Sequence, residues 1–408
     1  MKRVILSASA LMIGAIGFAQ TNNSEIVSAG NGNTATVSQT ETRNDSDIVQ
    51  TGDRNSADVI QLGFINTSVV NQTGDVNEAS VDQQGAFQGA VIDQVGNHNL
   101  ASIFQRGEVN NAAISSEGDL NSAGIEQFGL RNTADMFQDG DDNEAVSFVR
   151  GDDNDVDIDQ LGNDNYANAD AREGATSFFS SANTFTTSQI GDDNSSESFV
   201  LGGDLNTADI YQNGDFNEAL STQSGLSNTS ITNQVGETNI SSINQVGTSN
   251  YAYTDQGFTA GGDGVQNNKS YVNQNGKDNR SFVYQLDQLS GSNNYSAVDQ
   301  SGDANLVILQ QEFSGNNSDV DQMGDVNTSD IDQVGTENKS MVFQNGDFNI
   351  TIVDQGDFSG NNNSQFNESY VTQLGDGNTS IVSQLGNNHI STISQNGSGN
   401  TATATQNN

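Results

Sequence analysis

The sequence predicts an all-β fold: a two-sheet β-solenoid of stacked strand-turn-strand coils with cross-β-like pairing. One pattern, Gln-x-Gly-x-x-Asn-x-Ala/Ser-x-Val/Ile-x-Gln, recurs along the chain, usually with a spacing of 11 residues. Within each unit the Asn, Ala/Ser, Val/Ile and next Gln are two residues apart, which places them on one face of an extended strand. A Gly usually follows two residues after the Gln, where a tight bend needs a positive φ. A short fixed period of this kind is the signature of a solenoid.

The first residues form a separate segment. Lys2 and Arg3 precede an apolar run from Val4 to Phe18, and the segment ends in small residues, as a secretory signal peptide does. We therefore expect residues 1–19 to be a signal peptide and residues 20–408 to form a curlin-like repeat domain, a term explained below. A membrane-spanning helix is the alternative, and the short length of the apolar run disfavours it. The mature chain is thus expected to be exported.

The composition is strongly acidic, with 53 Asp+Glu against 12 Lys+Arg and a formal charge of -41. An apolar content of 32% with this charge is typical of disorder. A chain that repeats its apolar and amide residues in register can nevertheless pair them with their own copies, so we expect an ordered structure. Phosphate binding requires clustered Lys and Arg, so nucleic acid is excluded as a partner, and membrane insertion is not expected. Because the chain has no Cys, the repeat must replace a disulfide framework.

About 33 strands are expected, from Asn22–Ser28 to Asn400–Gln406. In Asn77–Gln83 the Asn, Ala, Val and Gln point inward, whereas the residues between them point outward. Four turns carry additional residues, and they follow Ala171, Gln256, Gln285 and Gln355. Since the strand pattern resumes after each of them, we interpret these insertions as enlarged turns rather than domain boundaries.

Two 11-residue units make one coil of about 22 residues if the strands alternate between two facing sheets. A second period supports this pairing, because acids follow the turn Gly at Asp53, Asp75, Asp119, Asp141, Asp303, Asp325 and Asp347. Unit charges one coil apart repel by roughly 0.9 kcal/mol even in water, and a bound Ca²⁺ would relieve the repulsion. These acids are therefore weak candidates for a metal site, and a solvated acidic edge is the favoured interpretation. We predict no cofactor, and we predict faster assembly at acidic pH or with added salt or calcium.

Stacked coils place Asn over Asn and Gln over Gln, so that buried side-chain amides can use both their donors and their acceptors. The predicted assembly ladder comprises Asn55, Gln61, Asn66, Gln72, Asn77, Gln83, Asn327, Gln333, Asn338, Gln344, Asn378 and Gln384. The pattern runs from near the expected cleavage site to Gln406 with no visible capping segment. Unpaired strand edges add more chain, and a head-to-tail contact does not close into a ring. We therefore expect the protein to be its own partner, in a homopolymeric filament.

The repeat also resembles a known family. The pattern Ser-x5-Gln-x-Gly-x-x-Asn-x-Ala-x3-Gln is that of the curlin repeat, and the segments Ser46 to Gln72 and Ser122 to Gln138 are similar to it apart from the spacing of the first Ser. The resemblance covers essentially the whole mature chain. It implies a secreted subunit of curli, the functional amyloid fibres of the biofilm matrix at the surface of Gram-negative-type bacteria, which mediate adhesion and aggregation. It also implies a related nucleator or co-subunit, an outer-membrane export pore and periplasmic chaperones as partners.

Other functions have weaker support. The two histidines, His98 and His389, lie far apart, and no nucleophile has a base and an orienting acid beside it, so we do not expect an enzyme. The alternative is a monomeric or surface-tethered β-solenoid adhesin, for which the outward aromatic residues are the candidate contacts. These are Phe104, Phe137, Phe148, Tyr211, Tyr284 and Phe343. Isolated exposed aromatic residues more often have no role.

Overall fold

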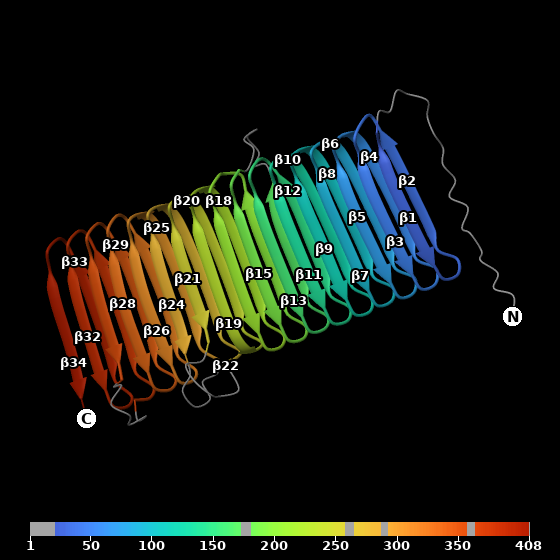
Figure 1. Cartoon of the computed structure of the whole chain (residues 1–408). Coiled ribbons are helices and arrows are strands. Elements are labelled where there is room, and N and C mark those ends of the chain that lie inside the picture. The colour runs from blue at the N-terminus through green and yellow to red at the C-terminus, as the bar shows by residue number, and fades with distance from the viewer. Residues whose placement is uncertain (1–20, 173–180, 258–264, 287–292, 357–363, 408) are drawn as a thin grey trace, which may run out of the picture. The chain divides into compact units, whose positions relative to one another are not determined.

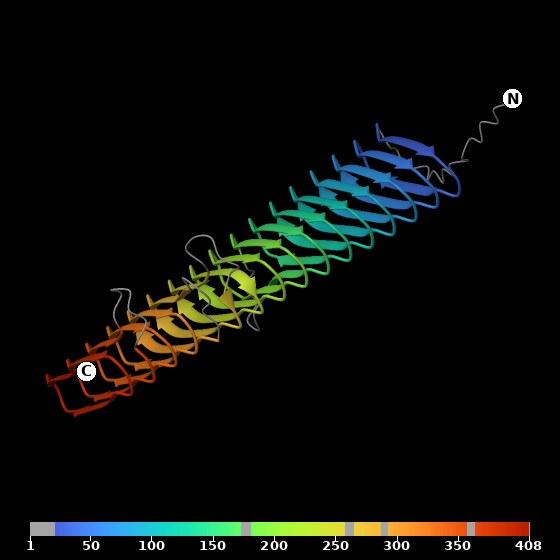
Figure 2. The ribbon, with the colours of Figure 1, turned by 90° about the horizontal axis from the view of Figure 1, so that it is seen from below.

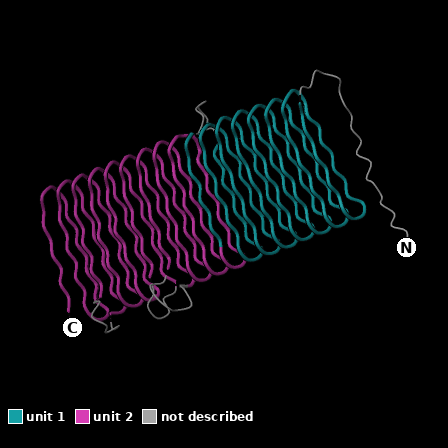
Figure 3. The backbone as a smooth tube through the Cα atoms, in the orientation of Figure 1, with its two compact units in different colours: residues 1–189 teal, residues 190–408 magenta. Residues whose placement is uncertain are grey.

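The computed structural model describes residues 21–172, 181–257, 265–286, 293–356 and 364–407. It divides into two compact units, residues 1–189 and residues 190–408, which Figure 3 shows in different colours. Every regular element within the described ranges is a β-strand, as the sequence predicts (Figure 1). In that part of the chain there is accordingly no helix with the length and hydropathy needed to cross a membrane. The expected signal peptide lies outside the described residues.

The first unit contains two parallel sheets, which Figure 2 shows as two layers. One sheet holds the odd-numbered strands β1 (Asn23–Ala29), β3 (Asp45–Thr51), β5 (Thr67–Thr73), β7 (Gly89–Val95), β9 (Asn111–Glu117), β11 (Thr133–Asp139), β13 (Asp155–Leu161) and β15 (Thr184–Ile190). The other sheet holds β2 (Thr34–Thr40), β4 (Ser56–Phe64), β6 (Glu78–Ala86), β8 (Leu100–Glu108), β10 (Ser122–Leu130), β12 (Glu144–Arg150) and β14 (Tyr166–Arg172). Consecutive strands therefore alternate between the two sheets.

The second unit repeats this arrangement. One of its sheets holds β16 (Ser195–Leu201), β18 (Glu218–Leu226), β20 (Ile240–Thr248), β23 (Lys269–Lys277), β25 (Tyr295–Asp303), β27 (Asn317–Met323), β29 (Lys339–Asn345), β31 (Glu368–Leu374) and β33 (Ile390–Asn396). The other holds β17 (Thr207–Asn213), β19 (Thr229–Glu237), β21 (Tyr251–Gln256), β22 (Val265–Gln266), β24 (Arg280–Leu286), β26 (Leu306–Glu312), β28 (Thr328–Val334), β30 (Ile350–Gln355), β32 (Thr379–Leu385) and β34 (Thr401–Asn407).

Strand pairing within each unit is parallel and in register, at the expected period. In the first unit β1 pairs with β3 so that Asn23 lies opposite Asp45, 22 residues later. In the second unit β32 pairs with β34 with the same offset, Thr379 opposite Thr401. Each coil thus contributes one strand to each sheet, and equivalent side chains form columns spaced by about 4.8 Å. The prediction of a two-sheet solenoid with 22-residue coils is confirmed for each unit.

Each column that faces the interior carries one type of residue. Val59, Val81 and Ile103 lie opposite one another on β4, β6 and β8, and each is at most 2% exposed. Full burial of such a side chain contributes about 1.5–3 kcal/mol. The alternating burial of β4, from Ser56 to Phe64, follows the period of two that the sequence shows. The apolar column therefore holds the two sheets together inside every coil.

Two backbone positions shape each turn. At Gly74 φ is 114°, and a Cβ there would collide with the carbonyl oxygen of Gly96 in the next coil. This confirms the turn glycine expected from the sequence. Two residues later Val76 also has a positive φ, 63°, although it has a branched side chain. Its N–H donates to the carbonyl of Asp53 at 2.9 Å, so the left-handed residue gains a hydrogen bond to the preceding coil.

The structure differs from the expected strands in two details. The first strand begins at Asn23 rather than Asn22, and the last ends at Asn407 rather than Gln406. The two-residue strand β22 is additional to the 33 expected strands, because the residues after the third described gap pair with the end of β19. The strand pattern resumes after each of the four insertions, which agrees with their interpretation as enlarged turns.

Candidate functional site: the amide ladders

The strand-closing glutamines form hydrogen-bonded ladders along each unit. Gln50 Nε2 donates to Gln72 Oε1 at 3.0 Å, and Gln72 Nε2 donates to Gln94 Oε1 at 2.9 Å. The second hydrogen of Gln50 Nε2 goes to the backbone carbonyl of Thr34, in the other sheet, at 2.9 Å. Each such glutamine therefore links one coil to the next and also joins the two sheets. Because both hydrogens are donated, the buried amide group avoids most of its desolvation cost.

The same geometry recurs in the second unit. Gln311 Nε2 donates to Gln333 Oε1 at 2.8 Å, and Gln333 Nε2 donates to Gln355 Oε1 at 2.9 Å. The bond from Gln384 to Gln406 Oε1, at 2.8 Å, is the last of this series in the described residues. In every case the donor belongs to the earlier coil. The glutamine ladder thus has a direction, with donors pointing toward the C-terminal end of each unit.

The strand-opening asparagines form a different type of ladder. Asn55 Oδ1 accepts the backbone N–H of Asn77 at 2.9 Å, so the bond runs from the later coil to the earlier one. Asn77 Nδ2 donates to the carbonyl of Gly96 at 2.8 Å. Asparagine therefore satisfies the backbone of the turn beside it, in addition to stacking on its own copies. The sequence predicts the asparagine column but not this pairing with the turn.

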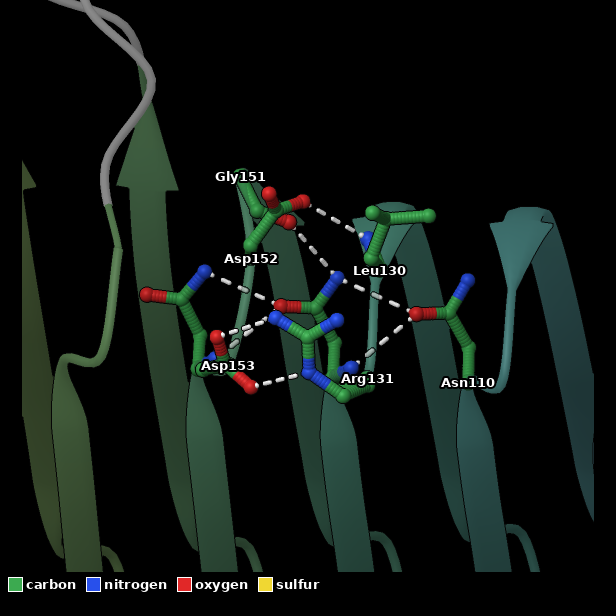
Figure 4. A network of polar contacts seen from close by, with 8 residues as sticks. Asn110, Leu130, Arg131, Gly151, Asp152 and Asp153 are labelled. Atoms are coloured by element: carbon green, nitrogen blue, oxygen red, sulfur yellow. Dashed lines mark hydrogen bonds and ion pairs between the residues drawn. The ribbon is translucent and has the colours of Figure 1, made fainter.

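Figure 4 shows one such turn in the first unit. Asn132 donates both its backbone N–H, at 3.0 Å, and its Nδ2, at 3.2 Å, to Asn110 Oδ1, and its Nδ2 also reaches the carbonyl of Gly151 at 2.8 Å. Beside it, Arg131 and Asp153 form a two-pronged ion pair with both bonds at 2.6 Å. Both of these side chains are about half exposed, so the pair adds little stability. The buried amides carry the connection between coils.

All twelve predicted ladder residues are buried, and none is more than 1% exposed. Six lie in the first unit, namely Asn55, Gln61, Asn66, Gln72, Asn77 and Gln83. Six lie in the second unit, namely Asn327, Gln333, Asn338, Gln344, Asn378 and Gln384. The structure therefore brings each set together inside its own unit. Their contribution to assembly between chains stays a prediction.

Substitutions within the ladders keep part of the bonding. At Gln88, which occupies an asparagine position, the backbone N–H donates to Asn66 Oδ1 and Nε2 donates to the carbonyl of Gly107. His389 occupies another asparagine position, and its N–H donates to Asn367 Oδ1 at 3.0 Å. Ser116 replaces a glutamine, and its hydroxyl donates to Gln138 Oε1 at 3.1 Å. Each substitute retains at least one bond to the neighbouring coil.

The turn acids have a structural task. Asp75 Oδ1 accepts the backbone N–H of Asp53 at 2.8 Å, and Asp325 Oδ1 accepts the N–H of Asp303 at 2.8 Å. Asn97 takes the same position in an intervening coil and accepts the N–H of Asp75 at 2.9 Å. The remaining candidates, Asp119, Asp141 and Asp347, take part in equivalent bonds. In the part of the chain that the structure describes, no three His, Asp or Glu side chains are grouped as metal ligands.

One positional requirement has no signal in residue type. The residue before each asparagine takes the left-handed conformation whether it is Ile65, Val76 or Phe87, with φ between 58° and 63°. This conformation usually selects Gly or Asn. The only available signal is position, two residues after the turn glycine and one before the asparagine.

Comparison with known families identifies the repeat. A family model described as the curlin associated repeat matches residues 42–74, 74–103, 96–129, 131–162 and 203–236. The chain is a curlin-repeat protein. A search of curated proteins gave no match to it. The ladders continue beyond the matched segments of this curlin-repeat protein, as the bond from Gln344 to Gln373 Oε1 at 2.9 Å shows. Curlin repeats characterise a structural family, and together with the two-sheet solenoid they fit a structural subunit of the curli type.

Proposed function

We propose that this protein is a secreted structural subunit that assembles by end-to-end templated stacking into extracellular, curli-like amyloid fibres. The fibres would belong to a biofilm matrix at the surface of a Gram-negative-type bacterium and would mediate adhesion and aggregation. The observation that carries the proposal is the directional amide ladder. Each coil presents glutamine donors on one side and acceptors on the other, so another copy can extend the ladder with the bonds used inside the chain.

The outermost described strands support this proposal. In the second unit β33 pairs with β31 and β34 pairs with β32, and each has one partner strand. The inward residues of β34 are only half-buried, whereas those of β32 are fully buried. Gln406 Nε2 donates to the carbonyl of Ile390 at 2.9 Å, and its second hydrogen is available to a further coil. A strand edge of this kind is a template for another chain.

The proposed partners follow from the same role. Another copy of this chain is the principal partner, and the curlin repeats suggest a related nucleator or co-subunit, an outer-membrane export pore and periplasmic chaperones. We propose no enzymatic activity and no cofactor for a subunit of this kind. The formal charge of -41 opposes binding to nucleic acid and to anionic membranes.

Replacing ladder glutamines tests the proposed mechanism. In a Gln61→Leu/Gln72→Leu/Gln83→Leu variant, neighbouring amides such as Gln50 Nε2 lose their acceptor. Each buried, unsatisfied amide costs about 1–3 kcal/mol. We expect growth from sonicated wild-type seeds, followed by an amyloid dye and by negative-stain microscopy, to be nearly abolished.

The matched control makes the same chemical change on the outward faces, as Gln84→Leu/Gln310→Leu. The two side chains are only partly buried, and each bonds an acid on its own strand. This control should grow at close to the wild-type rate. Unchanged growth of the ladder variant would refute templated stacking through the amides.

The alternative is a monomeric or surface-tethered adhesin with the same fold. Outward aromatic residues form stacked pairs, such as Tyr253 with Tyr284 at 5.6 Å between ring centroids, and stacked rings can contact sugars or surfaces. Self-seeding separates the two functions. A fibre subunit elongates from its own fragments, whereas an adhesin stays soluble at the same concentration and binds a ligand.

A further inference from the structure

Basic residues gather on one outward face of the first unit, although they are scarce in the chain. The sheet that contains β8, β10, β12 and β14 carries Arg106, Phe128, Arg150 and Arg172 at equivalent positions of successive strands. The register places Phe128 opposite both Arg106 and Arg150. Phe104 and Phe148 lie in the adjacent column of the same face. We call these six residues the arginine–phenylalanine stripe.

The stripe is an ordered stack. The rings of Phe104 and Phe128 are 5.3 Å apart, and those of Phe128 and Phe148 are 5.7 Å apart, between centroids. The Arg150 guanidinium lies 5.2 Å from the Phe128 ring and 5.0 Å from the Phe148 ring. Such cation–π contacts hold long side chains in place, so less conformational entropy is lost when a partner binds.

The stripe has unused charge. Arg172 pairs with Asp170, whereas within the described residues neither Arg106 nor Arg150 forms an ion pair. Glu126 lies between Phe104 and Phe148 and offsets one of the arginines. Arginines therefore still outnumber acids on this face, in a chain with 53 Asp+Glu and 12 Lys+Arg. Here two acidic molecules can approach with little repulsion.

A complementary face lies on the second unit. On β26, β28 and β30 the register aligns Ile308, Asp330 and Ile352 in one column and places Asp332 opposite Asp354 in the next. We call these five residues the acidic face. Neither Asp330 nor Asp332 has an ion-pair partner in the described ranges. Burial raises the pKa of Asp332 to about 6, and Asp330, Asp354 and Glu312 add to this through their charge. A facing guanidinium would relieve this crowding of carboxylates.

The two faces also match in their spacing. In the stripe, Phe104 and Phe148 are two coils apart with a charged residue between them, and on the acidic face Ile308 and Ile352 are two coils apart with Asp330 between them. Both faces belong to parallel sheets with the same strand spacing of about 4.8 Å. Contacts that fit at one coil therefore stay in register at the next. A partner without this repeat would lose register after one contact.

We propose that the arginine–phenylalanine stripe of one copy docks laterally on the acidic face of a second copy of this chain. Arg106 and Arg150 would face the column of Asp332 and Asp354, while the phenylalanines would cover the isoleucines. The two surfaces differ, so the contact is heterologous and each copy keeps one surface of each kind for another neighbour. Lateral docking is separate from end-to-end stacking and would align neighbouring fibres side by side.

Cysteine cross-linking tests this contact directly, because the chain has no native Cys. Full-length mature Arg150→Cys and Asp332→Cys proteins are mixed and oxidised mildly. We expect the disulfide-linked heterodimer to exceed either homodimer about five-fold. The control mixture replaces Asp332→Cys with Ser56→Cys, an exposed position on β4 outside both faces, and should give only background cross-linking. A predominance of Arg150→Cys homodimers would mean that stripes pair with each other and would overturn the proposal.

Charge exchange provides a second test. Arg106→Glu/Arg150→Glu should weaken lateral association about ten-fold, as expected for the loss of two pairs of up to about 0.7 kcal/mol each. Adding Asp332→Arg/Asp354→Arg to the same chain should restore it. Arg43→Glu/Arg54→Glu makes the same charge change elsewhere in the first unit and should have a much smaller effect. An equal effect of the control, or association that requires an added acidic polysaccharide, would overturn the proposal.

The two proposals can fail separately. Seeded elongation measures end-to-end stacking, whereas cross-linking and the width of bundles in negative stain measure lateral docking. Fibres that elongate without the heterodimer would overturn lateral docking alone. A heterodimer without seeded growth would overturn the proposed function and support the lateral contact.

Discussion

The two units build the same inward column from different small residues. In the first unit it is mainly alanine, at Ala57, Ala79, Ala90, Ala101, Ala112, Ala123, Ala134, Ala145 and Ala167, all at most 3% exposed. In the second unit it is mainly serine, at Ser196, Ser230, Ser241, Ser270, Ser281, Ser296, Ser318, Ser329, Ser340, Ser369, Ser380 and Ser391, all at most 4% exposed. Strand pairing is the same in both, so this column does not determine the fold.

The difference lies in the hydroxyl groups. In the second unit the buried hydroxyls of Ser318, Ser340 and Ser369 have no hydrogen-bond partner in the described structure. A buried polar group without a partner costs about 1–3 kcal/mol, whereas the equivalent alanine has no such cost. The first unit therefore has the better satisfied core. The comparison teaches that the amide ladders and turns specify the solenoid, whereas the small residue adjusts its stability.

Some polar core residues of the second unit do find partners. The hydroxyl of Ser329 donates to Gln344 Oε1 at 3.0 Å and accepts from Gln322 Nε2 at 3.1 Å. Thr232 and Ser241 share a hydrogen bond of 3.1 Å. A buried hydroxyl is therefore tolerated where a glutamine or a second hydroxyl is within reach.

The largest expected effect concerns the turn, which the units share. Gly74→Ala in the first unit and Gly324→Ala in the second should each destabilise their own unit by about 3 kcal/mol or more, because the added Cβ would strike the carbonyl oxygen of Gly96 or Gly346 in the next coil. Hydrogen exchange of the strands of each unit measures the loss.

Gly377→Ala is the matched control for these substitutions. Its φ is 65° and no atom lies within 4 Å of the added Cβ, so only the left-handed strain of about 1 kcal/mol remains. Equal losses at Gly74 and Gly377 would show that the contact between coils does not matter. A loss confined to one unit would show that the turns are not equivalent.

The sequence predicts these shared features because they repeat in phase. The Gln, Asn, Ala/Ser and Val/Ile columns are all inward, and the turn glycine and the enlarged turns lie where the spacing places them. The turn pairing of asparagine was missed, because a one-dimensional period shows that Asn77 stacks but not that its amide reaches Gly96. The left-handed residue at Val76 was missed because nothing in a valine side chain favours that conformation. The stripe was missed because its residues occur once rather than in every repeat.

The second prediction exchanges the small residues between the units. Ser318→Ala, Ser340→Ala and Ser369→Ala should each stabilise the second unit by about 1 kcal/mol, because each removes a hydroxyl without a partner. Ala112→Ser should destabilise the first unit by a similar amount. Denaturant titration of the soluble mature chain, read by hydrogen exchange in each unit, gives both values.

Ser329→Ala is the control in the same column of the second unit. Its hydroxyl has two partners, so its removal should destabilise by about 1 kcal/mol, the opposite sign to Ser318→Ala. If all the serine substitutions had the same sign, burial of hydroxyls would not explain the difference between the units.

The smallest expected effect is a pH dependence, which should also differ between the units. Outward acids have raised pKa values in both, through burial and then neighbouring acids for Asp135 and Asp157 in the first unit. In the second unit the pKa of Asp332 reaches about 6. An unfolded Asp titrates near 4, so between pH 4 and 6 the folded chain binds the proton more tightly. Stability should therefore rise as the pH falls from about 7 to 4 and change little from this group below 4.

Asp332→Asn tests this sign. The amide removes the titration, so the variant should be more stable than the wild type at pH 7, and its advantage should disappear by about pH 4. Asp325→Asn serves as the control, because it also removes one negative charge of the second unit but lies in a turn, where an amide oxygen can still accept the N–H of Asp303. Hydrogen exchange at pH 4, 5, 6 and 7, corrected for intrinsic exchange, should show the loss of pH dependence in β26, β28 and β30 for Asp332→Asn alone. An advantage of Asp332→Asn that persists unchanged to pH 4 would mean that packing rather than protonation is responsible.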